Sequence, residues 1–146
     1  MNLQDLQDEW ANDSKIDELT LGTESARCSM LHSKYMNFLI QARFNAKKAE
    51  NKLNQSKRLL TRYFNGLMTK DELRELDWPQ YQGTKPLKGE LLEMIEQNDG
   101  HIEVSNKHHY ARVTEDFLES VIKEIGNRTW HIKNCIRWTE WTNGEH

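Results

Sequence analysis

The sequence predicts a mainly α-helical protein, built on one long amphipathic helix with further helices toward the C-terminus and one short β element. Only seven of the 146 residues are glycine and two are proline, so helices can run for many turns without interruption. Hydrophobic residues make up 36% of the chain and charged residues 29%, a composition typical of extended helices or of subunits that complete their burial in an assembly. Five tryptophans argue against a disordered chain.

The N-terminal part of the chain is expected to hold a short helix and then the longest one. Residues 2–11 place their apolar side chains on one helical face. Residues 24–64 contain no glycine or proline, and Asn65-Gly66 is expected to end this helix with Gly66 just beyond it.

The remaining elements are shorter. Residues 67–86 form a connector with one acidic helical turn, and residues 87–97 have a helical pattern. Residues 101–104 follow a turn and are expected to form the short strand. Two more helical patterns, 108–125 and 129–141, are separated by Gly126-Asn127.

Charge is distributed unevenly along the chain. The total is −3, yet residues 27–62 carry nine Lys and Arg against one acid, Glu50, while residues 1–26 carry seven acids against one lysine. A basic block between acidic flanks is typical of a site for a polyanion.

Helical geometry places five of these cations together. With Arg43 at 0° and about 100° per residue, they share about 140° of one face of the long helix. Apolar residues occupy a separate stripe, in which Ala42, Ala46 and Ala49 favour close packing against another helix. The candidate nucleic-acid contacts are these cations and a neighbouring aromatic side chain: Arg43, Lys47, Lys57, Arg58, Arg62 and Tyr63.

Two interpretations of this face remain open. It is either a cationic track for a phosphate backbone, with Tyr63 stacking on bases, or a solvated helix surface. Like charges four residues apart, such as Arg58 and Arg62, destabilise a helix slightly, and a purely solubilising face would mix signs.

The C-terminal helical pattern has two apolar faces. Isoleucines lie on one side and three tryptophans on the other, so one face can pack within the subunit and the other would be exposed. Exposed apolar patches usually mark an interface, and we therefore expect this segment to build an oligomer; the alternative is that the tryptophans form the intramolecular core. The candidate oligomerisation residues are Phe117, Val121, Ile125, Trp130, Ile132, Ile136, Trp138 and Trp141.

Other function classes find little support. No phosphate-binding glycine loop and no nucleophile–base arrangement is present, so no enzyme activity and no cofactor are expected. The histidines at 101, 108 and 109 and the His131–Cys135 pair lack the spacing of a zinc site. No signal peptide or membrane-spanning run is expected, and Cys28 and Cys135 are expected to be reduced thiols.

Several stretches together resemble the UvsY-type recombination mediators of T-even-type phages. They are "LQDLQDEWANDSKID" at 3–17, Leu21, "ESA" at 24–26, "LHSKYMNFL" at 31–39, "RYFNG" at 62–66, "IEQNDGHIEV" at 95–104 and "DFLESVIKEI" at 116–125. The resemblance covers nearly the whole chain in the same order, and none of it is a catalytic signature.

The resemblance implies a non-enzymatic, ring-like homo-oligomer of six or seven subunits. Such proteins bind single-stranded DNA, contact the phage RecA-like recombinase and the phage single-strand-binding protein, and help the first replace the second. Their setting is the cytoplasm of the infected bacterial host. The C-terminal segment of the family is required for oligomerisation. On this basis residues 1–66 are assigned to DNA binding, 67–86 to a connector and 87–146 to oligomerisation.

The DNA-binding motif of the family, roughly Leu-Lys-Ala-Arg-Leu-Asp-Tyr, corresponds to "KRLLTRY" at 57–63. Arg58 and Tyr63 match its lysine and tyrosine. Leu60 replaces its arginine and Arg62 its aspartate, so the positive charge is redistributed. A helical scaffold or assembly protein with a solvated basic face is the alternative function.

Overall fold

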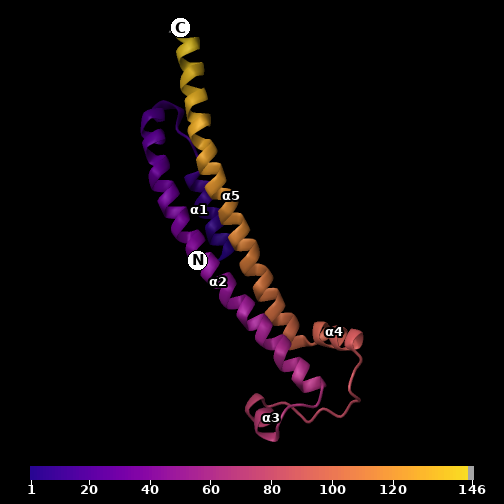
Figure 1. Ribbon diagram of the computed structural model, residues 1–146. Coiled ribbons are helices and arrows are strands. Elements are labelled where there is room, and N and C mark those ends of the chain that lie inside the picture. The colour runs from indigo at the N-terminus through magenta and orange to yellow at the C-terminus, as the bar shows by residue number, and fades with distance from the viewer. Residues whose placement is uncertain (145–146) are drawn as a thin grey trace. The chain divides into compact units, whose positions relative to one another are not determined.

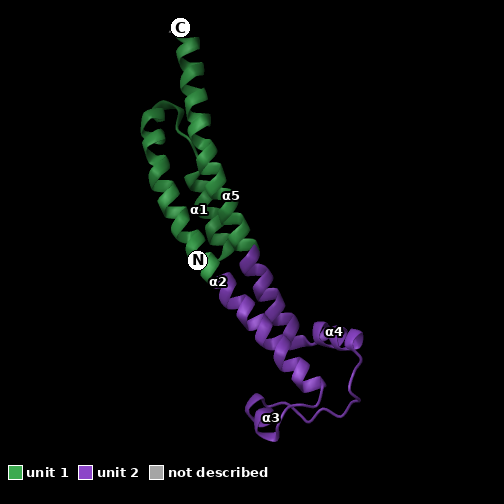
Figure 2. Ribbon diagram, in the orientation of Figure 1, with its two compact units in different colours: residues 1–44, 113–146 green, residues 45–112 purple. Residues whose placement is uncertain are grey.

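The computed structural model describes residues 1–144 and is α-helical, with no strand in that range (Figure 1). The predicted fold class is confirmed in its helical part, and the predicted β element is wrong. Residues pack into two compact units, unit 1 comprising 1–44 and 113–146 and unit 2 comprising 45–112 (Figure 2). The long helices α2 (Leu21–Phe64) and α5 (Asp99–Thr142) each contribute to both units. The two packing units therefore do not coincide with the DNA-binding and oligomerisation regions expected from the sequence.

Helix α1 (Leu3–Asp13) begins at a reciprocal cap. The Asn2 side chain accepts from the Asp5 amide at 2.8 Å, and the Asp5 carboxylate accepts from the Asn2 amide at 3.0 Å. Asp17 then caps the single turn η1 (Glu18–Thr20), which leads directly into α2 (Leu21–Phe64). The long helix therefore starts three residues before Glu24, the start expected from the sequence.

The core of unit 1 is formed where α1, α2 and α5 meet. Tyr35 is fully buried, and its ring lies edge-on to Trp10 at 5.2 Å and to Phe38 at 5.5 Å between centroids. The buried residues of this cluster come from all three helices: Leu6, Leu31, Tyr35, Leu39, Ala42, Leu118, Val121 and Ile125.

A buried polar network links the same helices. The Arg128 guanidinium donates to the carbonyl oxygens of Ser14 and Lys15 at 2.9 and 3.0 Å and lies 3.2 Å from a carboxylate oxygen of Glu24. Arg128 is only 4% exposed, and its Nε has no hydrogen-bond partner among residues 1–144. The network fixes the segment between α1 and α2 against α5 within unit 1.

Helix α2 ends as the sequence predicts. Gly66 has φ +69°, its amide donates to the Tyr63 carbonyl at 3.1 Å, and the Leu67 amide donates to the Arg62 carbonyl at 2.9 Å. These two bonds define a Schellman motif, which satisfies carbonyls that the helix leaves open. Helix α3 (Lys70–Leu76) follows at once, with Thr69 as its N-cap.

Helices α4 (Lys88–Gln97) and α5 (Asp99–Thr142) are separated by a single residue, Asn98. Its side chain accepts from the His101 amide at 3.0 Å and so begins α5 where a strand was predicted. The predicted break at Gly126-Asn127 is also wrong. Ile125 and Arg128 are both buried there, and this packing offsets the small helical cost of glycine.

No helix in the range 1–144 is both long enough and apolar enough to cross a bilayer.

Candidate nucleic-acid interface

The basic part of α2 in unit 2 presents four cations that make no ion pair within residues 1–144. Lys48, Lys52, Lys57 and Arg58 are all exposed on consecutive turns. Two of them, Lys57 and Arg58, were predicted contacts. The other two, Lys48 and Lys52, were not among the predicted contacts because their helical angles, about 140° and 180°, lie about 40° and 80° beyond the arc drawn from Arg43.

Three predicted contacts are paired with carboxylates. Arg62 reaches both oxygens of Glu72 at 2.8 and 2.9 Å, and it also donates to the Leu67 carbonyl at 3.4 Å. Lys47 lies 3.4 Å from Glu50 on the next turn. Both pairs are partly exposed, and such pairs contribute little free energy in water, so a phosphate can compete for the cation.

The third paired cation, Arg43, belongs to unit 1, where it lies 3.6 Å from Glu119 of α5. The candidate interface is therefore restricted to unit 2.

Tyr63 is part of an aromatic cluster at the end of α2. Its hydroxyl donates to the Pro79 carbonyl at 2.8 Å, and its ring lies 5.2 Å from Trp78 and 5.6 Å from Tyr81 between centroids. Phe64 completes the cluster. Both ends of the Tyr63 side chain are therefore engaged within unit 2, and stacking on a base would have to share the ring with these neighbours.

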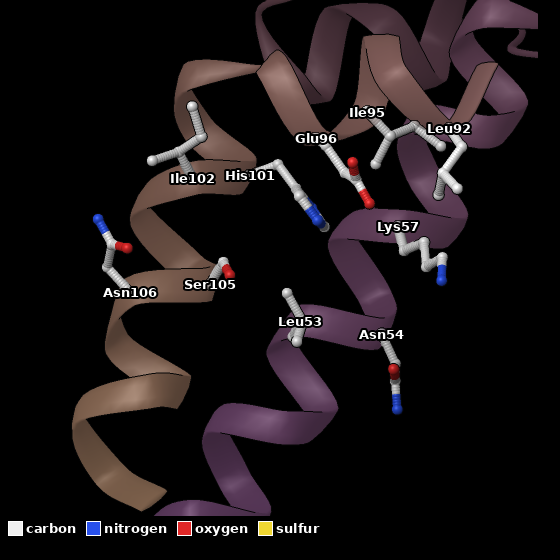
Figure 3. A pocket seen from close by; sticks show the side chains of 10 residues that line it. All are labelled: Leu53, Asn54, Lys57, Leu92, Ile95, Glu96, His101, Ile102, Ser105 and Asn106. Atoms are coloured by element: carbon white, nitrogen blue, oxygen red, sulfur yellow. The ribbon is translucent and has the colours of Figure 1, made fainter. Parts of the chain in front are cut away.

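A cavity of about 420 Å³ adjoins Lys57 and is named here the Lys57 hollow. Leucine and isoleucine side chains form its walls, and His101 and Glu96 point into the space between α2, α4 and α5 (Figure 3). His101 is buried, and its Nδ1 lies 2.9 Å from the Ser56 hydroxyl, which ties α5 to α2 inside unit 2.

The C-terminal segment keeps its tryptophans exposed. Trp130, Trp138 and Trp141 are 65%, 67% and 62% exposed, which excludes the alternative that they form the core of the subunit. The predicted oligomerisation residues on the other face lie inside unit 1: Val121, Ile125 and Ile132 are buried, and Phe117 packs on the core. Ile136, at 37% exposure, is the isoleucine of this set that remains accessible.

The described residues contain no group of three or more His, Cys, Asp or Glu side chains placed to hold a metal ion. His131 and Cys135 do share a hollow with Trp138 in unit 1, and both cysteines are free thiols.

Three crystal structures of the bacteriophage T4 recombination mediator protein UvsY share this fold. Lattice type II matches with a TM-score of 0.85, covering 98% of this chain and 98% of that one. Lattice type IV gives 0.84, with coverage of 97% and 99%, and lattice type I gives 0.82, with 94% and 98%. Sequence identity is 22% in each case, so the likeness is one of fold.

No curated protein sequence matches the chain. A family model does, and it is described as "Recombination, repair and ssDNA binding protein UvsY". Because this model matches residues 9–145, the chain belongs to the UvsY family.

Proposed function

We propose that the protein is a phage recombination mediator that binds single-stranded DNA through α2 of unit 2 and helps load a recombinase. The observation that carries the DNA-binding part is the set of four exposed cations, Lys48, Lys52, Lys57 and Arg58, which have no carboxylate partner among residues 1–144. Unpaired cations on successive turns can neutralise successive phosphates and release their counterions.

The sign of the charge supports binding over solvation alone. Lys48 and Lys52 are four residues apart on one helix face, and Glu50 is the only acid between 27 and 62. Such like-charge neighbours cost the free helix a few tenths of a kcal/mol, a cost that a bound phosphate chain would remove. A scaffold protein has no need for that arrangement.

Oligomerisation is the second part of the proposal. The exposed tryptophans of α5 are the surface we assign to contacts between copies of the chain, in a ring of six or seven subunits as the family resemblance implies. Several copies of a weak cationic site on one strand bind much more tightly than one copy.

The partners are single-stranded DNA, a phage RecA-like recombinase and a phage single-strand-binding protein, in the cytoplasm of the infected host. No catalytic step is assigned to the chain. Holding the strand through its phosphates would loosen the single-strand-binding protein. Because most bases stay available, the strand would then be presented to the recombinase.

The test compares salt-dependent binding of a single-stranded oligonucleotide by two variants that each lose two charges. Lys52→Ala/Arg58→Ala should lower affinity and flatten the slope of log K against log salt by about 0.7 for each phosphate that is no longer neutralised. Lys15→Ala/Lys123→Ala removes two exposed cations of unit 1 and should match the wild type. An equal decrease in both variants would contradict an interface on α2, and no binding by the wild type would favour the scaffold function.

Loading is tested separately. The protein should speed replacement of the single-strand-binding protein by the recombinase on a long strand, and Lys52→Ala/Arg58→Ala should slow it. A protein that binds the strand but leaves this exchange unchanged would not be a mediator.

A further inference from the structure

A second cavity of about 380 Å³ lies in unit 2 and is named here the Trp78 hollow. Its size is within the range of small-molecule sites. Its lining combines an aromatic ring, aliphatic side chains, amides and one cation: Lys52, Gln55, Ser56, Leu59, Leu60, Trp78, Asn98, Gly100, His101 and Val104.

This hollow opens on the side of α2 that carries Lys48 and Lys52, two of the four unpaired cations. Residues 48, 52, 55, 59 and 62 follow one another at spacings of three and four and therefore lie in one strip along the helix. Gln55 and Leu59 line the hollow, with Lys52 on one side of them and Arg62 on the other. A strand bound along these cations would pass over its mouth.

Trp78 is held in place by its neighbours. Its amide donates to the Leu73 carbonyl at 2.9 Å, and its ring makes an edge contact with Tyr63. Tyr63 is itself anchored by the bond from its hydroxyl to the Pro79 carbonyl. The indole is thus positioned before any ligand arrives, which lowers the entropic cost of stacking on it.

Charge distinguishes the two cavities. The Lys57 hollow includes the carboxylate of Glu96, which points into it (Figure 3). The Trp78 hollow has no acidic residue among its lining residues, and the amides of Gln55 and Asn98 can face polar edges of a ligand. An aromatic ring beside a cation, with no acid in the same lining, suits a nucleobase attached to a phosphate.

We propose that the Trp78 hollow receives one base of the bound single strand, stacked on the indole, while Lys52 contacts an adjoining phosphate. This inference rests on the proposed function and assigns it a base-stacking residue. Tyr63 then acts as a positioning residue that holds Trp78.

The experiment compares two oligomers of equal length and charge, one of thymidine nucleotides and one of abasic deoxyribose phosphates. Wild-type protein should prefer the thymidine strand by about fivefold or more, since stacking of one base is worth at least that factor. Trp78→Leu should abolish the preference, and Trp78→Phe should keep part of it. Ser105→Leu fills the Lys57 hollow and should retain the wild-type preference.

The outcomes separate the two proposals. If the wild type binds both strands equally well, the base site is wrong and the phosphate interface stands; if it binds neither, the proposed function itself fails. If Ser105→Leu lost the preference for the thymidine strand, the base would bind in the Lys57 hollow, and its assignment to the Trp78 hollow would be wrong.

Trp78→Leu must be checked for helix content and oligomer mass. If this variant does not fold, photocrosslinking of the wild-type protein to a 5-iododeoxyuridine oligomer tests the proposed base site instead. The crosslink should form at Trp78, and a crosslink confined to exposed tryptophans such as Trp130 would overturn the proposal.

Discussion

At the scale of single residues, Asp13 of unit 1 has a buried carboxylate that three side chains contact. Its carboxylate accepts from Lys34 at 2.6 Å, from Tyr35 at 2.8 Å and from Arg27 at 3.2 Å. Burial alone would raise the pKa of Asp13, but the hydrogen bonds from Lys34 and Tyr35 and the charges of Lys34 and Arg27 hold this pKa below its ordinary value. Burial and the bond to Asp13 raise the pKa of Tyr35.

These interactions make unfolding depend on pH. A carboxyl whose pKa is lower in the folded state contributes stability above its unfolded pKa of about 3.9, and this contribution is lost as pH falls through the folded value. Asp13→Asn should therefore lower the free energy of unfolding by about 3 kcal/mol at pH 7, and the difference from wild type should shrink below about pH 4. Urea unfolding from pH 7 to pH 3 measures this, with exposed Asp116→Asn as the control. A difference that does not change with pH would contradict the assignment.

Arg128 is another buried charged residue of unit 1. Arg128→Leu would leave the Glu24 carboxylate with only Arg27, at 3.5 Å, and would remove both donors from the Ser14 and Lys15 carbonyls. We expect a decrease of about 3–5 kcal/mol in the free energy of unfolding by urea, the range for breaking one side of a buried pair. Arg137→Leu, exposed on the same helix, should change stability by less than about 0.5 kcal/mol. Similar decreases in the two variants would show that Arg128 has no special role.

At the scale of elements, two glycines have opposite roles. Gly66 ends α2 with φ +69°, a conformation that costs other L-residues about 1–2 kcal/mol, whereas Gly126 lies exposed within α5. A Cβ at either position would meet no atom within 4 Å, so the backbone alone decides the effect.

Substituting alanine at each position should therefore shift the thermal midpoint in opposite directions. Gly66→Ala should destabilise by about 1 kcal/mol, and Gly126→Ala should stabilise by about 0.5–1 kcal/mol because alanine favours the helix. Calorimetry or circular dichroism checks both. Destabilisation by Gly126→Ala would indicate that α5 needs a break there.

At the scale of the whole molecule, the exposed tryptophans of α5 are not part of the core of unit 1. Three large side chains on the C-terminal part of α5 expose more than half of their surface, while Ile125 and Ile132 on the opposite face are 3% and 1% exposed. A helix with one face in its own core and another apolar face in water is typical of a subunit that assembles.

Trp130→Ser/Trp138→Ser should accordingly reduce the native mass of the assembly and, through reduced avidity, weaken binding to a long single strand. Helix content should stay close to wild type because neither side chain is in the core. Native mass measurement checks this, with exposed Met30→Ser as the control. An unchanged native mass would show that the exposed tryptophans of α5 do not form the contacts between subunits.

Residue spacing within a few turns was enough to predict α1, α2 and α4, the end of α2 at Gly66 and the two faces of the C-terminal segment. Helix geometry makes each of these features predictable, because it fixes the direction of every side chain around the axis. Spacing was a poor guide at residues 101–104, where the Asn98 cap begins a helix in a stretch too short for periodicity to separate from a strand.

The availability of each cation depends instead on tertiary packing. Arg62 pairs with Glu72 and Arg43 with Glu119 because folding brings together residues from different helices, while Lys48 and Lys52 have no such partner in the described part of the chain. The same holds for Trp78, which lies in a connector with no periodic pattern, yet packs against Tyr63 and lines a cavity with Lys52. Spacing along one helix fixes a side chain's direction, but its partners come from distant parts of the chain, and these are set by the packing of the whole unit.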